Sequence, residues 1–150
     1  MQLEFIKTHE DAKLPEKNYK DPLTGDAGLD LFSIEDVLIL PGESKIVNVG
    51  LKLGNITPGY WFRIEARSGL GFKKGLQPHF GIIDNSYRGD LAIKVYNLSN
   101  DKQVISKGQG VAQMIVYEMI KAEVSWTDQA TEGERGNKGF GSSDKNTSND

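Results

Sequence analysis

Residues 89–98, GDLAIKVYNL, show the pattern that decides the fold. Apolar and polar residues alternate along them, which is typical of a strand with one buried face. Similar runs, rich in β-branched and aromatic residues, recur: LEFIK (3–7), LDLFSI (29–34), DVLIL (36–40), KIVNVGLKL (45–53), YWFRIEA (60–66), KQVIS (102–106) and VAQMIVYEMI (111–120). Turn signals such as LPGE and TPGY separate them, and no stretch has a long helical period. The sequence therefore predicts an all-β jelly-roll barrel or sandwich.

The composition excludes several classes of partner and of active site. The 150 residues fit one domain, and a net charge of -3 gives no general attraction to nucleic acid or to an anionic membrane. The absence of cysteine excludes disulfides, thiolate metal sites and a thiol nucleophile, and two histidines are too few for a His-rich zinc site. The first residues do not resemble a signal peptide, so we expect a cytoplasmic protein with neither nucleic acid nor membrane as partner.

The composition changes after Trp126. Residues 127–150 contain no Val, Ile, Leu or Met, so they cannot form a core. We therefore expect a β core at 1–126 and a flexible C-terminal arm at 127–150. Within the arm, RGNKGFGSS (135–143) combines glycines, cations and a ring. Glycine-rich backbone amides and Arg135 are suited to a phosphate, and Phe140 to stacking on a flat ring.

Two acidic positions stand out. GIIDNSYRGD (81–90) ends an apolar run in Asp84 and continues through Tyr87 to a second acid, Asp90. By itself it reads either as a β-hairpin with a solvated loop or as a catalytic turn. DAGLDLFS (26–33) places Asp30 between two apolar residues. A buried carboxylate is costly unless it is paired, so Asp30 is a metal residue, a member of a polar network or a solvent-facing residue.

Two further stretches suggest anion binding. ARSGLGFKKG (66–75) leaves a strand and places Arg67, Ser68 and Gly69 in succession, as in an anion-binding turn. GQGVAQMIV (108–116) is a turn followed by a strand, in which Gln113 either donates its amide to a phosphate or faces water. Each signal alone is weak.

Taken in order, AGLDLFS, RSGLG, GIIDNSYRGD, GQGVAQMI and RGNKGFGSS resemble the five motifs of the trimeric dUTPase family. The resemblance runs from about residue 22 to residue 143. It implies a jelly-roll homotrimer with three active sites between subunits. It also implies Mg²⁺-assisted hydrolysis of dUTP to dUMP and pyrophosphate.

The resemblance also implies roles for single residues. Asp84 would activate the attacking water, Tyr87 would lie under the deoxyribose and exclude a 2′-hydroxyl, and Asp30 would lie near the metal, acting through water. The positions matching phosphate contacts are Arg67, Ser68, Gly69 and Gln113. The positions matching the arm that closes over the nucleotide are Arg135, Phe140, Gly141 and Ser142.

The sequence departs from the family pattern at several points. The fourth motif, residues 108–113, lacks the usual acid and arginine, and Lys138 replaces a glycine of the fifth. QPHF (77–80) stands where the uracil-reading hairpin is expected, and we expect the base to be read mainly by backbone groups there. Two alternatives remain open: a dCTP deaminase or bifunctional deaminase of the same superfamily, and a dUTPase-like trimer that binds and regulates a protein partner.

Overall fold

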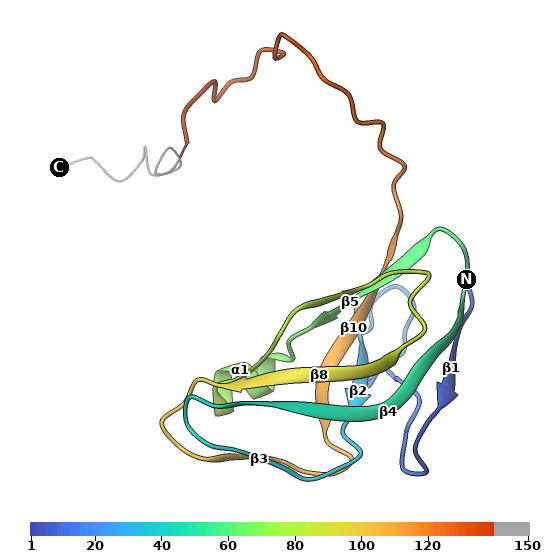
Figure 1. Cartoon of the computed structure of the whole chain (residues 1–150), viewed down its shortest axis with the longest axis vertical. Helices are drawn as coiled ribbons and strands as arrows, with labels where there is room; N and C mark the ends of the chain where they lie inside the picture. Colours follow the sequence, from blue (N-terminus) through green and yellow to red (C-terminus); the bar gives the residue numbers. More distant parts are fainter. Residues whose placement is uncertain (140–150) are drawn as a thin grey trace, which may run out of the picture. The chain divides into compact units, whose positions relative to one another are not determined.

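The computed structural model describes residues 1–139 and is almost entirely β (Figure 1). Its strands are β1 (Leu3–Lys7), β2 (Leu29–Phe32), β3 (Val37–Ile39), β4 (Ser44–Ile56), β5 (Tyr60–Glu65), β6 (Leu76–Pro78), β7 (Gly81–Ile83), β8 (Asp90–Asn97), β9 (Gln103–Ile105) and β10 (Gly110–Glu118). The described residues contain one helix, α1 (Ser68–Lys74). This confirms the predicted all-β class, and every run quoted above forms a strand.

The strands form two four-stranded antiparallel sheets and a two-stranded ribbon. The first sheet has the order β1-β4-β8-β6, the second has the order β2-β10-β5-β7, and β3 pairs with β9. In the first sheet the long strands β4 and β8 run side by side (Figure 1). Strands that are neighbours in space are mostly distant in sequence, so chain segments with different motifs are brought together.

The core contains the apolar residues of the alternating strands. In β8, Leu91, Ile93 and Val95 are buried while the residues between them are more exposed. The buried core residues of the other strands include Val47, Val49, Leu51 and Leu53 of β4, Leu31 of β2, Phe62 and Ile64 of β5, and Val111 and Met114 of β10. Burial of this apolar surface is the main stabilising contribution to the fold.

The buried polar residue Asn97 ends β8 and links it to the ribbon. Its side chain is 0% exposed and fully hydrogen-bonded. Nδ2 donates to the carbonyls of Ile39 at 2.9 Å and Asp101 at 2.8 Å, while Oδ1 accepts from the Ser99 backbone N–H and hydroxyl. A buried amide with all partners satisfied fixes one arrangement of the segments that it joins.

The structure differs from the sequence prediction between residues 66 and 90. Residues 68–74 form a helix rather than an open turn, ended by Gly75 at φ 64°. The strands β6 and β7 pair with β8 and β5 respectively, so they belong to different sheets. The interpretation of residues 81–90 as a β-hairpin is therefore wrong. Likewise, β6 and β7, which flank His79 and Phe80, do not pair with each other, and the His79 N–H still donates to the Lys94 carbonyl of β8 at 2.7 Å.

The chain divides into two compact units, Met1–Ile120 and a second unit that begins at Lys121. The first unit contains all ten strands listed above and the helix. In the part of the chain that the structure describes, no helix has the length and apolar character to cross a membrane.

Candidate functional site

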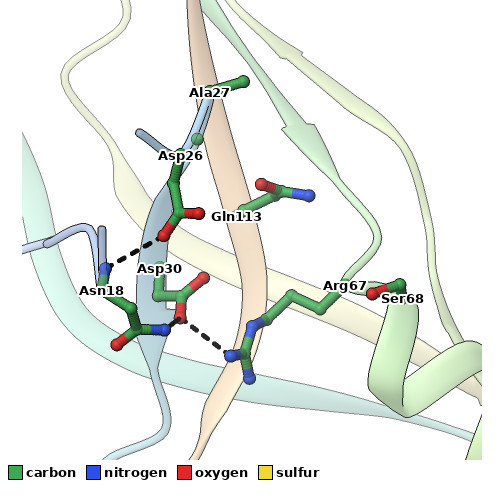
Figure 2. Close-up of a pocket in the computed structure, with 8 residues that line it drawn as sticks. Asn18, Asp26, Ala27, Asp30, Arg67, Ser68 and Gln113 are labelled. Atoms are coloured by element: carbon green, nitrogen blue, oxygen red, sulfur yellow. Dashed lines mark hydrogen bonds and ion pairs between the residues drawn. The ribbon is translucent and has the colours of Figure 1, made fainter. Parts of the chain in front are cut away.

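A polar cavity of about 180 Å³ opens in the first unit beside β2, β10 and the start of α1. Its lining residues are Asn18, Asp26, Ala27, Gly28, Asp30, Arg67, Ser68 and Gln113. Figure 2 shows how the labelled side chains converge from β2 and the segment before it, from β10, and from the residues between β5 and α1. Asp30, Arg67, Ser68 and Gln113 come from three motifs distant in sequence, so the fold brings together four of the residues that the sequence selected.

Two of the lining residues form an ion pair. The Nη2 atom of Arg67 lies 2.9 Å from Oδ2 of Asp30, and the two side chains are 30% and 14% exposed. Burial raises the pKa of the Asp30 carboxyl, Arg67 opposes that rise, and the nearby Asp26 adds to it. Of the three alternatives for Asp30, membership of a polar network is therefore the one observed within the single chain.

Two glycines leave room for this arrangement. A Cβ atom on Gly110 would lie 2.6 Å from Nη1 of Arg67, and the Gly110 carbonyl accepts a hydrogen bond from that nitrogen at 2.9 Å. A Cβ atom on Gly28 would collide with Oε1 of Gln113. A larger residue at either position would therefore force the Arg67 or the Gln113 side chain to shift from its place in the cavity.

Gln113 lies in β10 between the other two strands of the site. Its Cα faces Asp30 on β2 and Glu65 on β5. Its Nε2 donates to the Ala66 carbonyl at 2.8 Å, and the side chain is half-buried. Gln113 therefore does not simply face water. Its amide holds the end of β5, directly before Arg67.

Ser68 and Gly69 begin helix α1 and are exposed. Ser68 lies beside Arg67 at the edge of the cavity (Figure 2). A Cβ atom on Gly69 would meet nothing within 4 Å. Packing within the chain therefore does not explain the glycine at position 69, in contrast to Gly28 and Gly110.

Two further residues of the cavity, Asn18 and Asp26, were not selected from the sequence. Asp26 Oδ2 accepts hydrogen bonds from the backbone N–H groups of Asn18 at 3.1 Å and Tyr19 at 3.0 Å. Asn18 Nδ2 in turn points to Asp30 Oδ2 at 3.4 Å. A sequence signal existed for Asp26, because an aspartate beside glycines in a loop commonly bonds backbone amides.

The turn of residues 84–89 places Asp84 and Tyr87 at the surface. Asn85 anchors this turn, because its Nδ2 donates to the carbonyls of Thr57 at 3.0 Å and Tyr60 at 2.9 Å. The Tyr87 hydroxyl donates to the Asp90 carbonyl at 2.9 Å. Asp84 is exposed, and the five ion pairs of the described residues all involve other carboxylates.

The single chain does not bring all the predicted residues together. Asp84 and Tyr87 do not line the cavity around Asp30. Arg135 lies in the second unit, in a turn where its carbonyl accepts from the Lys138 N–H at 3.3 Å. Phe140, Gly141 and Ser142 lie outside the described residues.

The carboxylates of the cavity are suited to a metal that is bound together with a phosphate ligand. Residues 1–139 contain no group of three or more His, Cys, Asp and Glu side chains arranged to hold a metal. The cavity itself has two carboxylates, Asp26 and Asp30, against one guanidinium. Mg²⁺ typically keeps several waters and binds through one or two carboxylates plus substrate phosphates. The residues present therefore fit Mg²⁺ in that form.

Comparisons with known proteins agree with these observations. The family model described as dUTPase matches residues 12–144. A deoxyuridine 5′-triphosphate nucleotidohydrolase of Nautilia profundicola is 38% identical, over 97% of this chain and 100% of the relative. The enzyme of the same name from a Hydrogenobaculum species is 37% identical, over 95% and 97%.

Solved structures give the same result. A mutant dUTPase of Staphylococcus bacteriophage 80alpha, solved with dUpNHpp, is similar with a TM-score of 0.84 and 27% identity. The match covers 95% of this chain and 98% of the phage chain. A mutant dUTPase of phage phi11, described with a structural Mg(II) ion, shares the fold with a TM-score of 0.78 and 24% identity. With the family model covering most of its length, the chain belongs to the dUTPase family.

Proposed function

We propose that this protein hydrolyses dUTP to dUMP and pyrophosphate, with Mg²⁺, in the cytoplasm. The observation that carries the proposal is the convergence of Asp30, Arg67, Ser68 and Gln113 on one polar cavity in a chain of the dUTPase family. The relatives described above are dUTP nucleotidohydrolases, which favours hydrolysis over the deaminase alternative. Hydrolysis would limit uracil in DNA and supply dUMP.

The cavity is suited to phosphate once a cation is present. Arg67 and the Ser68 hydroxyl are donors at its edge, whereas Asp26 and Asp30 repel an anion. Mg²⁺ supplies the positive charge that neutralises a triphosphate and polarises its phosphorus. Asp30 would face the metal through water, while Arg67, Ser68, Gly69 and Gln113 would position the phosphates.

The exposed turn supplies the remaining chemistry. Asp84 would accept a proton from the attacking water, and Tyr87 would pack against the deoxyribose. The Tyr87 ring is held by its bond to the Asp90 carbonyl and fits against Gly89, where a Cβ atom would collide with the phenol. A fixed ring beside the second carbon of the sugar is suited to rejecting a 2′-hydroxyl by steric exclusion.

A homotrimer would complete the site. The cavity of about 180 Å³ is smaller than the roughly 300–1,000 Å³ of typical ligand sites. It also lacks Asp84 and Tyr87. Large apolar side chains are exposed on the first unit, among them Phe72 at 94% and Ile82 at 65%. Exposed apolar groups of this size are suited to contacts with other copies, which would bring the turn of one subunit to the cavity of another.

The C-terminal segment would contribute the last contacts. We take 127–150 as an arm whose Arg135, Phe140, Gly141 and Ser142 bind the nucleotide. Removing all residues after Gly133 tests this role: the trimer should persist and turnover should fall strongly. Full turnover by the shortened chain would exclude the arm from the mechanism.

The decisive experiment is a substrate panel. The protein is incubated with Mg²⁺ and, separately, dUTP, UTP, dTTP and dCTP, and the release of pyrophosphate and of ammonia is measured. We expect pyrophosphate from dUTP alone. Ammonia from dCTP would instead establish the deaminase alternative, and no reaction with any nucleotide would reject catalysis. The Asp84→Asn variant controls for contaminating phosphatases.

A further inference from the structure

Resting on the proposed function, we propose that Asp26 is a positioning residue: through Asn18 it fixes which oxygen of Asp30 faces the cavity. The device consists of three residues, Asn18, Asp26 and Asp30, here called the loop clamp. Asn18 and Asp26 lie in the irregular segment that precedes β2, and Asp30 lies in β2 itself. The three residues line the cavity (Figure 2).

The first part of the clamp closes the loop. Asp26 Oδ2 accepts the backbone N–H groups of Asn18 and Tyr19 at 3.1 and 3.0 Å, and the Asp26 N–H donates to the Tyr19 carbonyl at 2.9 Å. Three bonds therefore tie one residue to the opposite side of the loop. A carboxylate that accepts two backbone amides holds an irregular segment in one conformation.

The second part of the clamp acts on Asp30. Asn18 Nδ2 lies 3.4 Å from Asp30 Oδ2, and Arg67 Nη2 lies 2.9 Å from the same oxygen. The Asp30 backbone is also fixed, because its N–H donates to the Glu16 carbonyl at 2.8 Å. Two donors on Oδ2 leave Oδ1 outside both contacts. Since the terminal torsion of an aspartate is broad, these donors decide how the carboxylate is turned.

Loss of the clamp would change the pairing inside the cavity. Without Asn18, the Asp30 carboxylate is free to turn and offer both oxygens to Arg67, because carboxylates and guanidinium groups favour two parallel bonds. That arrangement would occupy one further N–H group of Arg67 and both oxygens of Asp30. The cavity would then bind phosphate and hydrated Mg²⁺ less well, although no direct contact had been removed.

A matched control exists in the same loop. Asp21 Oδ1 also accepts two backbone N–H groups, from Leu23 at 2.9 Å and Thr24 at 2.7 Å. It is exposed and does not line the cavity. Asp21→Ala therefore removes the same kind of bonding from the loop without touching Asn18 or Asp30.

The test measures binding rather than turnover. Calorimetry follows a non-hydrolysable imido analogue of dUTP at a series of Mg²⁺ concentrations, for the wild type, Asp26→Ala, Asp26→Asn, Asn18→Ala and Asp21→Ala. We expect Asp26→Ala and Asn18→Ala to raise the Mg²⁺ concentration for half-maximal binding by about tenfold, as for other residues that orient a metal-facing group. Asp26→Asn keeps an acceptor oxygen and should restore most of the binding, and Asp21→Ala should match the wild type.

Two results would overturn the proposal. One is an Asp26→Ala or Asn18→Ala curve that coincides with that of Asp21→Ala. The other is an Asp26→Asn variant as damaged as Asp26→Ala, which would mean that Asp26 acts by its charge. Should Asp26→Ala fail to fold, the Asn18→Ala curve decides the matter. Failure of the wild type itself to bind the analogue would instead reject the proposed function.

Discussion

The cavity around Asp30 and the turn around Asp84 both hold an acid singled out by the sequence, but the chain treats them differently. The Asp30 side chain is 14% exposed and contacts Arg67 and Asn18. Asp84 is exposed, and only its backbone carbonyl is used, accepting the Tyr87 N–H at 3.0 Å. The Asp30 carboxylate is bonded by side chains of its own chain. At Asp84 only the backbone is bonded, and the carboxylate is open to solvent.

This difference extends to the way in which the chain holds the two segments. Asn85 ties the turn to the carbonyls of Thr57 and Tyr60, so the position of Asp84 is set although its side chain is not. A fixed, exposed carboxylate is suited to meet a ligand presented by another surface. The cavity, in contrast, holds two opposite charges, those of Arg67 and Asp30, against each other within one chain.

The strongest test of the comparison is Asp84→Asn. Because this exposed carboxylate contributes no ion pair among residues 1–139, the substitution should leave the thermal unfolding midpoint unchanged. Turnover of dUTP should fall by about 10²–10⁴-fold, since the amide cannot accept the proton of water. Pyrophosphate release and thermal unfolding measure the two effects. Turnover within about threefold of the wild type would remove Asp84 from the chemistry.

In the cavity, a substitution is expected to lower the stability of the fold as well as nucleotide binding. Gly110→Ala would place a methyl group 2.6 Å from Arg67 Nη1 and 2.9 Å from its Cζ, so the guanidinium must shift from the position in which it pairs with Asp30. We expect a loss of about 1–3 kcal/mol in unfolding free energy, as for other overpacked sites, together with weaker nucleotide binding. Denaturant unfolding and calorimetry measure both.

Gly69→Ala is the matched control for this substitution. Nothing lies within 4 Å of the added Cβ, and alanine favours a helix over glycine, so Gly69→Ala should be at least as stable as the wild type. Equal stability of the Gly110→Ala and wild-type proteins would show that Arg67 relaxes without cost, and the cavity would then be less rigid than its contacts indicate.

Much of the fold was predictable because long strands repeat one physical pattern. The alternation in β8 and the apolar runs of β4 and β10 are extended enough to identify strands. The strands β6 and β7 have three residues each, too few for a period to appear. Helix α1 has seven residues including Gly69 and Gly71, so neither its length nor its helix propensity marks it in the sequence.

The residues of the cavity were predictable where their side chains belong to a recognisable motif, and not where they bond to backbone groups. Asp30, Arg67 and Gln113 belong to recognisable motifs, and the structure places them together. Asp26 accepts the backbone amides of Asn18 and Tyr19 in an irregular loop, a type of contact without periodicity in sequence. The structure shows which residues lie together, and the roles of all the site residues stay predictions.

A smaller effect is expected at Tyr87, which belongs to the exposed turn. Tyr87→Ala should raise the use of UTP relative to dUTP by about tenfold, because a 2′-hydroxyl is then no longer excluded. Tyr87→Phe keeps the ring and loses the hydrogen bond to the Asp90 carbonyl. The ratio of kcat/KM for the two nucleotides should move in the first variant and stay nearly constant in the second. An unchanged ratio in Tyr87→Ala would exclude the steric role.

The smallest effect concerns a surface ion pair that contrasts with the one in the cavity. Lys107 Nζ lies 2.6 Å from Asp11 Oδ2, and both side chains are well exposed, at 53% and 36%. Hydrogen bonding to Lys107 lowers the pKa of Asp11 below 3.8, whereas burial raises that of Asp30. A lowered pKa means that the ionised Asp11 stabilises the fold above pH 3.8, and that this contribution is lost as the pH falls through the folded-state pKa.

Asp11→Asn should therefore lower the thermal unfolding midpoint slightly at neutral pH and not at all well below pH 3.8. Exposed pairs are weak and screened by salt, so the difference should also shrink at high ionic strength. Lys107→Met is the matched control, because Asp11→Asn should have almost no further effect in that background. If Asp11→Asn still lowers the thermal unfolding midpoint in acid, or in the Lys107→Met background, Asp11 acts through its shape or its backbone. The contrast between the surface pair and the cavity pair would then not rest on charge.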